Sequence, residues 1–284
     1  MNKIQILILC SFLLTSSIVI SQETVQSLND VTSLKQQPSL LTEESHTVFA
    51  EYATTTWCPN CPVASSALYE LSQTTTQPFT YVTLVTDVNK NARERSRNGY
   101  YNVAIPSVYF DGGYKHLIGS GGTTSATMEI YSDLIDDSLL RKNIKDVLLQ
   151  TQATWQGNAE LNIQVTITNN ELLPYIGFVK TYVTEIESRW EDYAGDPYHY
   201  ALLDFAIETP IILFPKQTRT LTANWDGKQN HNGLSFPDIT QDNILISSAV
   251  FHFVPYLKKG YETDQFTQRY FGFYADQSDS TFPE

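Results

Sequence analysis

The amino-acid sequence predicts an α/β domain followed by an all-β sandwich domain. Until about residue 142, short apolar strands alternate with segments of helical periodicity, and beyond that point apolar residues recur at every second position. The length of 284 residues is sufficient for two domains of ordinary size. We therefore expect the two domains at 46–142 and 143–284.

The predicted α/β domain has the element order β-α-β-α-β-β-α. Asp111-Gly112-Gly113 is a turn signal between two extended segments, and it predicts a hairpin. A helix is predicted after the first strand, because from Pro62 onward five apolar side chains share one helical face: Val63, Ala64, Ala67, Leu68 and Leu71. The other expected elements are strands at 48–54, 79–85, 103–110 and 114–118 and helices at 91–98 and 125–141.

The second half of the chain has the two-residue period of half-buried strands. Leu161, Ile163, Val165 and Ile167 alternate strictly with polar residues. About seven strands are expected, at 149–155, 161–167, 178–186, 200–207, 218–225, 244–254 and 266–274. Regular spacing of such strands is typical of an immunoglobulin- or fibronectin-like sandwich.

The N-terminus has the layout of a secretory signal peptide. Lys3 provides a positive start, residues 4–20 are mostly apolar, and Ser21 is a small residue at a suitable cleavage position. We expect a signal peptide at 1–21 and a polar linker at 22–45. The sequence thus predicts an extracytoplasmic protein (secreted, periplasmic or cell-surface), with membrane contact only if the leader is retained as an anchor.

The negative overall charge of the protein argues against a nucleic-acid partner. The formal net charge is −13 and the pI is near 4.7, whereas a nucleic-acid-binding protein needs a basic face. The apolar share of 42% is typical of a folded globular protein. No nucleic-acid partner is expected.

Cys58 and Cys61 form a CxxC motif, and the only other cysteine, Cys10, lies in the expected leader. A zinc site usually needs four Cys or His ligands, and no second pair accompanies this one. A purely structural bridge would close a very short loop and so remove little unfolded-state entropy. The third alternative, reversible thiol–disulfide exchange, fits a strand-to-helix position, with Cys58 as N-cap and Pro59 as the first helical residue.

Two segments together resemble the thioredoxin superfamily: Trp57-Cys58-Pro59-Asn60-Cys61 and Ala104-Ile105-Pro106-Ser107. The resemblance covers about residues 46–142 and implies a thioredoxin-like α/β domain. It implies that Pro106 is a cis-proline facing the disulfide, and that Trp57, Pro59 and Ile105 bind substrate. The sequence departs from the thioredoxin pattern in the Pro-Asn dipeptide between the cysteines. The architecture of leader, α/β domain and β-sandwich also resembles the outer-membrane proteins related to Omp28.

Glu51 is a further candidate, because thioredoxins carry a buried acid five positions before the matching tryptophan. Here Glu51 precedes Trp57 by six positions. With a loop one residue longer, this carboxylate would help to deprotonate Cys61; a carboxylate that is only hydrogen-bonded is the alternative.

The sequence thus predicts an exported thiol–disulfide oxidoreductase acting on protein disulfides. Cys58 would attack the substrate, and Cys61 would resolve the mixed disulfide. No metal or organic cofactor is expected, and electrons would pass through an unidentified redox partner. The alternative is a cell-surface or envelope binding protein with a structural disulfide.

Overall fold

The computed structural model describes residues 46–284, and the expected signal peptide and polar linker lie outside them. The elements follow in the order β1 (Val48–Thr54), α1 (Cys61–Thr74), β2 (Phe79–Val85), α2 (Lys90–Tyr100), β3 (Ser107–Phe110), η1 (Asp111–Gly113), β4 (Lys115–Ile118), α3 (Thr124–Leu139), β5 (Val147–Gly157), β6 (Glu160–Asn169), β7 (Tyr175–Glu191), β8 (Pro197–Leu213), β9 (Thr218–Asp226), η2 (Gln241–Asn243), β10 (Ile244–Thr263) and β11 (Phe266–Thr281). The predicted order of helices and strands up to residue 142 and the seven later strands are therefore present.

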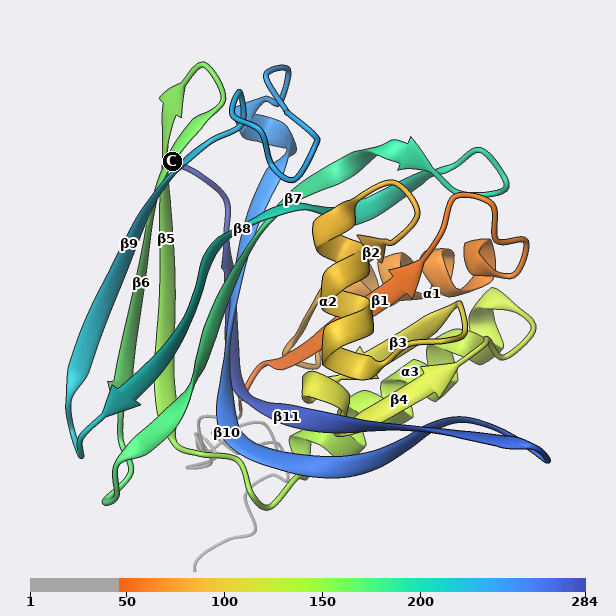
Figure 1. Ribbon diagram of the computed structural model, residues 1–284, viewed down its shortest axis with the longest axis horizontal. Helices are drawn as coiled ribbons and strands as arrows, with labels where there is room; N and C mark the ends of the chain where they lie inside the picture. Colours follow the sequence, from red (N-terminus) through yellow and green to blue (C-terminus); the bar gives the residue numbers. More distant parts are fainter. Residues whose placement is uncertain (1–45) are drawn as a thin grey trace, which may run out of the picture. The chain divides into compact units, whose positions relative to one another are not determined.

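These strands assemble into one large mixed sheet and one small sheet. The large sheet has eight strands in the order β11-β10-β7-β8-β2-β1-β3-β4, and the small sheet has the order β5-β6-β9. β1 and β2 are parallel, whereas β1–β3, β3–β4, β7–β8, β7–β10 and β10–β11 are antiparallel. Four strands from the second half of the chain thus continue the sheet that the first half begins (Figure 1).

The predicted fold class, a thioredoxin-like α/β domain followed by an immunoglobulin- or fibronectin-like sandwich, is wrong. Strands hold 52% of the described residues and helices 20%, and no separate α/β domain is formed. The expected boundary at residues 142–143 falls between α3 and β5, yet strands from both sides share the eight-stranded sheet. The reason is that a two-residue period marks a strand with one buried face but does not specify its neighbours.

The seam between the two halves of the large sheet lies between β2 and β8. The two strands pair in parallel at Thr83 and Ala201, and the Thr83 hydroxyl donates to the carbonyl oxygen of His199 at 2.7 Å. Asn89, the N-cap of α2, donates to the carbonyl oxygens of Leu202 and Leu203. Side-chain hydrogen bonds therefore supplement a short backbone ladder.

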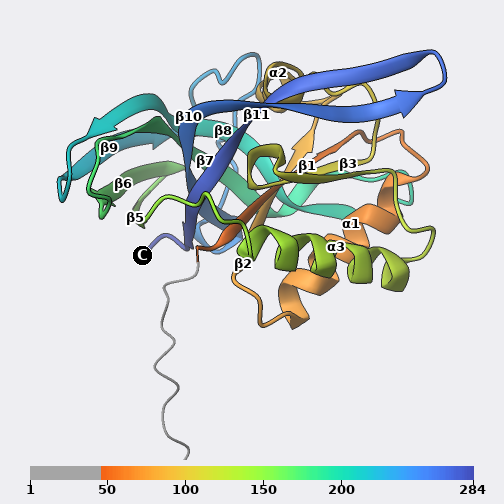
Figure 2. The ribbon, with the colours of Figure 1, turned by 90° about the horizontal axis from the view of Figure 1, so that it is seen from below.

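The helices and the small sheet cover the large sheet from both sides (Figure 2). α1 and α3 pack on one face of β1 and β3 through residues such as Leu68 and Ile135. The small sheet covers β7, β8 and β10, with Ile163 and Val165 packed against Val179 and Val250. α2 lies on the other face, where its Ala92 joins a core with residues of β1, β7 and β10.

The turn between β3 and β4 is tied to the C-terminal hairpin by a close backbone approach. Gly112 has a φ of +65°, and a Cβ atom there would lie 1.9 Å from the carbonyl oxygen of Phe273. Only glycine fits this position. The predicted hairpin turn at residues 111–113 is confirmed, and it also serves as a contact with β11.

Candidate functional site

The loop between β1 and α1 carries the CxxC motif, and hydrogen bonds hold its first residues, Thr55 and Thr56. The carbonyl oxygen of Thr55 accepts from the Cys58 amide at 3.4 Å and from the Tyr198 hydroxyl at 2.9 Å. The Asp87 carboxylate accepts from the amide of Thr56 at 3.2 Å and from its hydroxyl at 2.5 Å. Because Tyr198 belongs to β8, the second half of the chain helps to position this loop.

Cys58 and Cys61 are joined by a disulfide bond, so the predicted pairing is confirmed. Both residues are buried, with 3% of Cys58 and none of Cys61 exposed. The residues around them, Trp57, Pro59 and Asn60, are exposed. Within residues 46–284, no group of three or more His, Cys, Asp or Glu side chains is arranged to hold a metal ion.

Helix α1 begins later than the sequence predicted. Its first residue is Cys61, its N-cap is Asn60, and Pro62 occupies the first turn. Cys58 is therefore not the N-cap, and Pro59 is not the first helical residue, because residues 59–60 form a turn before the helix. Cys61 instead lies directly at the positive end of the helix dipole, with no acidic residue in the first turn.

Tyr52 is the buried side chain behind Cys61, and the sequence interpretation missed it. Its hydroxyl donates to the carbonyl oxygen of Cys61 at 2.9 Å and contacts the Thr54 hydroxyl at 3.1 Å. Burial raises the pKa of Tyr52 well above its ordinary value, so the hydroxyl stays protonated as a donor. The available signal was its spacing: Tyr52, rather than Glu51, precedes Trp57 by five positions.

Glu51 points away from the disulfide, on the face of β1 that α2 covers. Its carboxylate accepts from Arg95 Nε at 2.7 Å, from Arg95 Nη2 at 2.5 Å, from the Tyr182 hydroxyl at 2.9 Å and from the Tyr100 hydroxyl. Complete burial acts to raise the pKa of Glu51, but the Arg95 charge and these hydrogen bonds outweigh it and lower the pKa. Glu51 thus matches the alternative of a hydrogen-bonded carboxylate and makes no contact with Cys61 among its hydrogen bonds.

The Ile105–Pro106 peptide bond is cis, as the sequence predicted. The following residue, Ser107, pairs with Ala53 near the end of β1, which places Pro106 beside the start of the CxxC loop. The carbonyl oxygen of Pro106 accepts from the Gly119 amide at 2.8 Å. The two predicted segments, 57–61 and 104–107, are therefore brought together.

A surface hollow of about 460 Å³ lies next to this loop and has both Trp57 and Ile105 on its wall. Trp57 is 63% exposed and Val103, on the same wall, is 58% exposed. Arg93 and Arg97 from α2 and the acidic Asp87 also line the hollow, and Arg93 donates to the carbonyl oxygens of residues 86 and 87. The hollow offers apolar surface and charges of both signs next to the CxxC loop.

The comparisons with known proteins find similarity only at the level of structure. No family model and no curated protein matches the chain. Among solved structures, HBP35 of Porphyromonas gingivalis is similar over 84% of this chain and 76% of its own, with a TM-score of 0.60 and 9% identity. A structural-genomics protein of Agrobacterium tumefaciens aligns over 85% of this chain and 96% of its own, with a TM-score of 0.49 and 14% identity. The likeness to HBP35 is one of fold alone.

No helix among residues 46–284 has both the length and the apolar character needed to cross a membrane.

Proposed function

We propose that this protein exchanges thiols and disulfides with polypeptide substrates through Cys58 and Cys61. The observation that carries the proposal is the disulfide between them at the N-terminus of α1, next to a hollow lined by Trp57 and Ile105. A helix N-terminus stabilises a thiolate and lowers the pKa of a thiol beside it. The site would act outside the cytoplasm, where protein disulfides persist.

The exchange has two balanced steps. In the dithiol form, the Cys58 thiolate attacks one sulfur of a substrate disulfide, and the other substrate sulfur leaves as a thiolate. The Cys61 thiolate then attacks Cys58 Sγ and releases the first substrate sulfur as a second thiolate. Two electrons thereby pass to the substrate, and the Cys58–Cys61 disulfide forms. After a substrate has been reduced, a dithiol partner protein returns the site to its dithiol form. The reverse sequence oxidises a substrate dithiol, and a disulfide-bearing partner protein then reoxidises Cys58 and Cys61.

Burial of the disulfide is consistent with selective access. With 3% of Cys58 and none of Cys61 exposed, a substrate sulfur reaches Cys58 only if the cover formed by the exposed residues Trp57, Pro59 and Asn60 moves. An extended chain bound in the hollow beside Trp57 would be placed to displace that cover. Exchange with a polypeptide should thus be faster than exchange with a small disulfide of equal reduction potential.

The test uses the full chain carrying Cys10→Ser, so that only two thiols titrate. Its reduction potential is measured against glutathione mixtures, and its catalysis is measured by insulin reduction and by refolding of a scrambled disulfide protein. We expect Cys58→Ser to abolish both activities. We expect Cys61→Ser to accumulate a mixed disulfide on Cys58, because the resolving thiol is missing.

Circular dichroism on both variants separates loss of chemistry from loss of fold. Equal activity of the parent and Cys58→Ser in both assays would sink the proposal. That outcome would favour the alternative, a binding protein in which the buried disulfide only stabilises the CxxC loop.

A further inference from the structure

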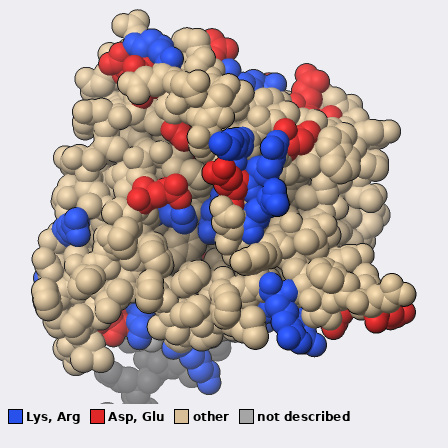
Figure 3. All heavy atoms as spheres, viewed as in Figure 1, with Lys and Arg blue, Asp and Glu red and all other residues tan. Residues whose placement is uncertain are grey.

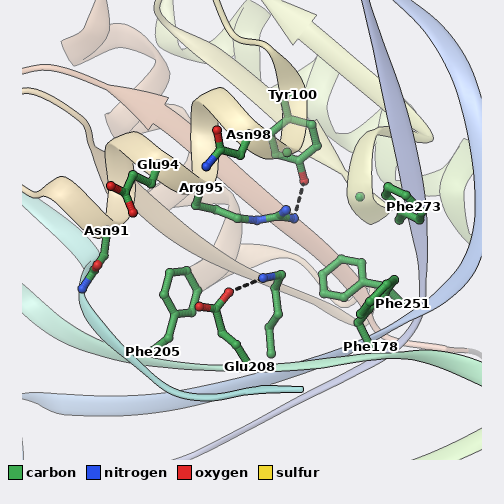
Figure 4. Close-up of a pocket in the computed structure, with 13 residues that line it drawn as sticks. Asn91, Glu94, Arg95, Asn98, Tyr100, Phe178, Phe205, Glu208, Phe251 and Phe273 are labelled. Carbon is green, nitrogen blue, oxygen red and sulfur yellow. Dashed lines mark hydrogen bonds and ion pairs between the residues drawn. The ribbon is translucent and has the colours of Figure 1, made fainter. Parts of the chain in front are cut away.

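A second pocket, of about 390 Å³, lies between α2 and the face of the large sheet that carries Glu51. Its walls come from α2, β7, β8, β10 and β11, so both halves of the chain build it (Figure 4). The volume falls in the range of small-molecule sites, which is about 300–1,000 Å³. Because Glu51 and Tyr52 point to opposite faces of β1, this pocket is separate from the disulfide site.

Four phenylalanine rings form the apolar part of the pocket. Phe178 and Phe273 pack edge to face with ring centroids 5.8 Å apart, and Phe205 and Phe251 lie nearer to the cations. Phe178, Phe205 and Phe273 are only partly buried. Aromatic walls of this kind stack favourably on a flat, apolar ligand.

Two cations with uncommitted donors lie among these rings. Arg95 uses Nε and Nη2 on Glu51, whereas its Nη1 forms no hydrogen bond within residues 46–284. Lys180 Nζ donates to Glu208, and an ammonium group has three donors. The guanidinium of Arg95 lies 5.5 Å from the Phe251 ring centroid, and Lys180 Nζ lies 5.3 Å from that of Phe205.

Arg95 and Lys180 lie deeper in the pocket than the two carboxylates of its lining, Glu94 and Glu208. Burial, followed by repulsion from Arg95, lowers the pKa of Lys180 in spite of its partner Glu208. The side chains of Arg95 and Lys180 are 13% and 21% exposed, whereas that of Glu208 is 48% exposed and belongs to the rim. On this face of the molecule, acidic and basic side chains lie side by side near the middle, and further charged side chains lie toward the edges (Figure 3). A bound carboxylate would relieve the repulsion between the two deeper cations.

We propose that this pocket binds a small aromatic carboxylate, with its ring among Phe178, Phe251 and Phe273 and its carboxylate between Lys180 and Arg95. The ligand's carboxylate takes over the Lys180 ammonium from Glu208 and adds the free Nη1 donor of Arg95. The ring replaces water on the phenylalanine walls. A small aromatic carboxylate thus contacts both the phenylalanine rings and the two cations of the pocket.

The test compares three probes of one shape by calorimetry on the full chain: phenylacetate, phenylacetamide and phenethylamine. We expect phenylacetate to bind about tenfold more tightly than phenylacetamide, because hydrogen bonds to charged groups replace neutral ones. Phenethylamine should bind most weakly. Equal affinity for all three probes, tightest binding of phenethylamine or no saturable binding of phenylacetate would overturn the proposal.

Two variants and a control locate the site. Lys180→Met should remove the preference for phenylacetate over phenylacetamide, whereas Lys259→Met, at an exposed lysine outside the pocket, should keep it. Glu208→Gln should strengthen phenylacetate binding, since it removes the competing carboxylate. This third variant keeps the test decisive even if Lys180→Met unfolds. Weaker binding in Glu208→Gln would contradict the assignment of the carboxylate to Lys180.

Discussion

The two faces of strand β1 hold their surroundings by different means. On one face, the Tyr52 hydroxyl donates to the carbonyl oxygen of Cys61. The Thr54 hydroxyl contacts those of Tyr52 and Tyr198, and Tyr198 donates to the CxxC loop at Thr55. On the other face, Glu51 is an ionised, fully buried carboxylate with Arg95 and two tyrosine hydroxyls as partners. Because successive side chains of a strand point to opposite faces, neighbouring residues serve separate parts of the molecule.

This difference predicts that the Glu51 face of β1 is rigid and that the CxxC loop on the other face moves more easily. A buried charge pair is costly to break, so the Glu51 face should be a rigid core. The CxxC loop is held by separate hydrogen bonds to Tyr198 and Asp87, each worth about 0.5–3 kcal/mol, so we expect this loop to open more easily than the Glu51 face. The following variants test this division, from the largest expected effect to the smallest.

Arg95→Met should cause the largest loss of stability. It leaves the Glu51 carboxylate buried without its cation, and breaking such a pair costs about 3–5 kcal/mol of the free energy of unfolding. Urea denaturation measures the loss. The double variant Arg95→Met with Glu51→Met should recover much of it. The reduction potential of the disulfide should stay unchanged, and a shifted potential would show that the two faces of β1 are coupled.

The stability of the protein should decrease in acid partly because of Glu51. The folded-state pKa of Glu51 is lowered from 4.5, so the unfolded state binds more protons below about pH 4.5. Stability from this group is complete above that pH and is lost as the pH falls toward the folded-state pKa. Urea titrations between pH 3 and 7 should show a shallower pH dependence for Glu51→Gln than for the parent. Glu94→Gln, at an exposed carboxylate, should not differ from the parent in slope.

Removal of single hydroxyl groups should distinguish the two faces. Tyr52→Phe removes the hydrogen bond to the Cys61 carbonyl and should cost about 0.5–1.5 kcal/mol, because one buried hydrogen bond is lost. It should also speed alkylation of the reduced Cys58 thiol by iodoacetamide. The matched control Tyr182→Phe removes a hydroxyl from Glu51 and should leave the alkylation rate unchanged. An equal acceleration in both variants would mean that general loosening, rather than the loop contact, controls access.

Trp57→Ala should have the smallest effect on stability, within about 0.5 kcal/mol, because the side chain is largely exposed. If the hollow beside the disulfide receives polypeptide, the variant should reduce kcat/KM for insulin reduction. Exchange with oxidised glutathione, which is too small to span the hollow, should be preserved. Equal losses with both substrates would argue that Trp57 acts on the disulfide itself.

Local patterns in the sequence were sufficient for much of the site. The CxxC spacing identified the disulfide pair, and the resemblance of the Ile-Pro-Ser segment to thioredoxins implied the cis bond at Pro106. The start of α1 was misplaced because Pro59 and Pro62 are both acceptable near a helix N-terminus. Glu51 was considered a candidate because it precedes Trp57 by nearly the spacing of the buried acid in thioredoxins, whereas the face to which it points depends on the register of β1.

The sequence by itself determined which segments are strands and helices, since periodicity and turn residues act over a few positions. Only the tertiary structure decided that β7, β8, β10 and β11 join the sheet of β1 to β4. It likewise decided that Tyr198 reaches the CxxC loop and that Arg95 and Tyr182 enclose Glu51. The physical reason is that strand pairing and buried polar contacts join residues far apart in the chain, where no local period records the partner.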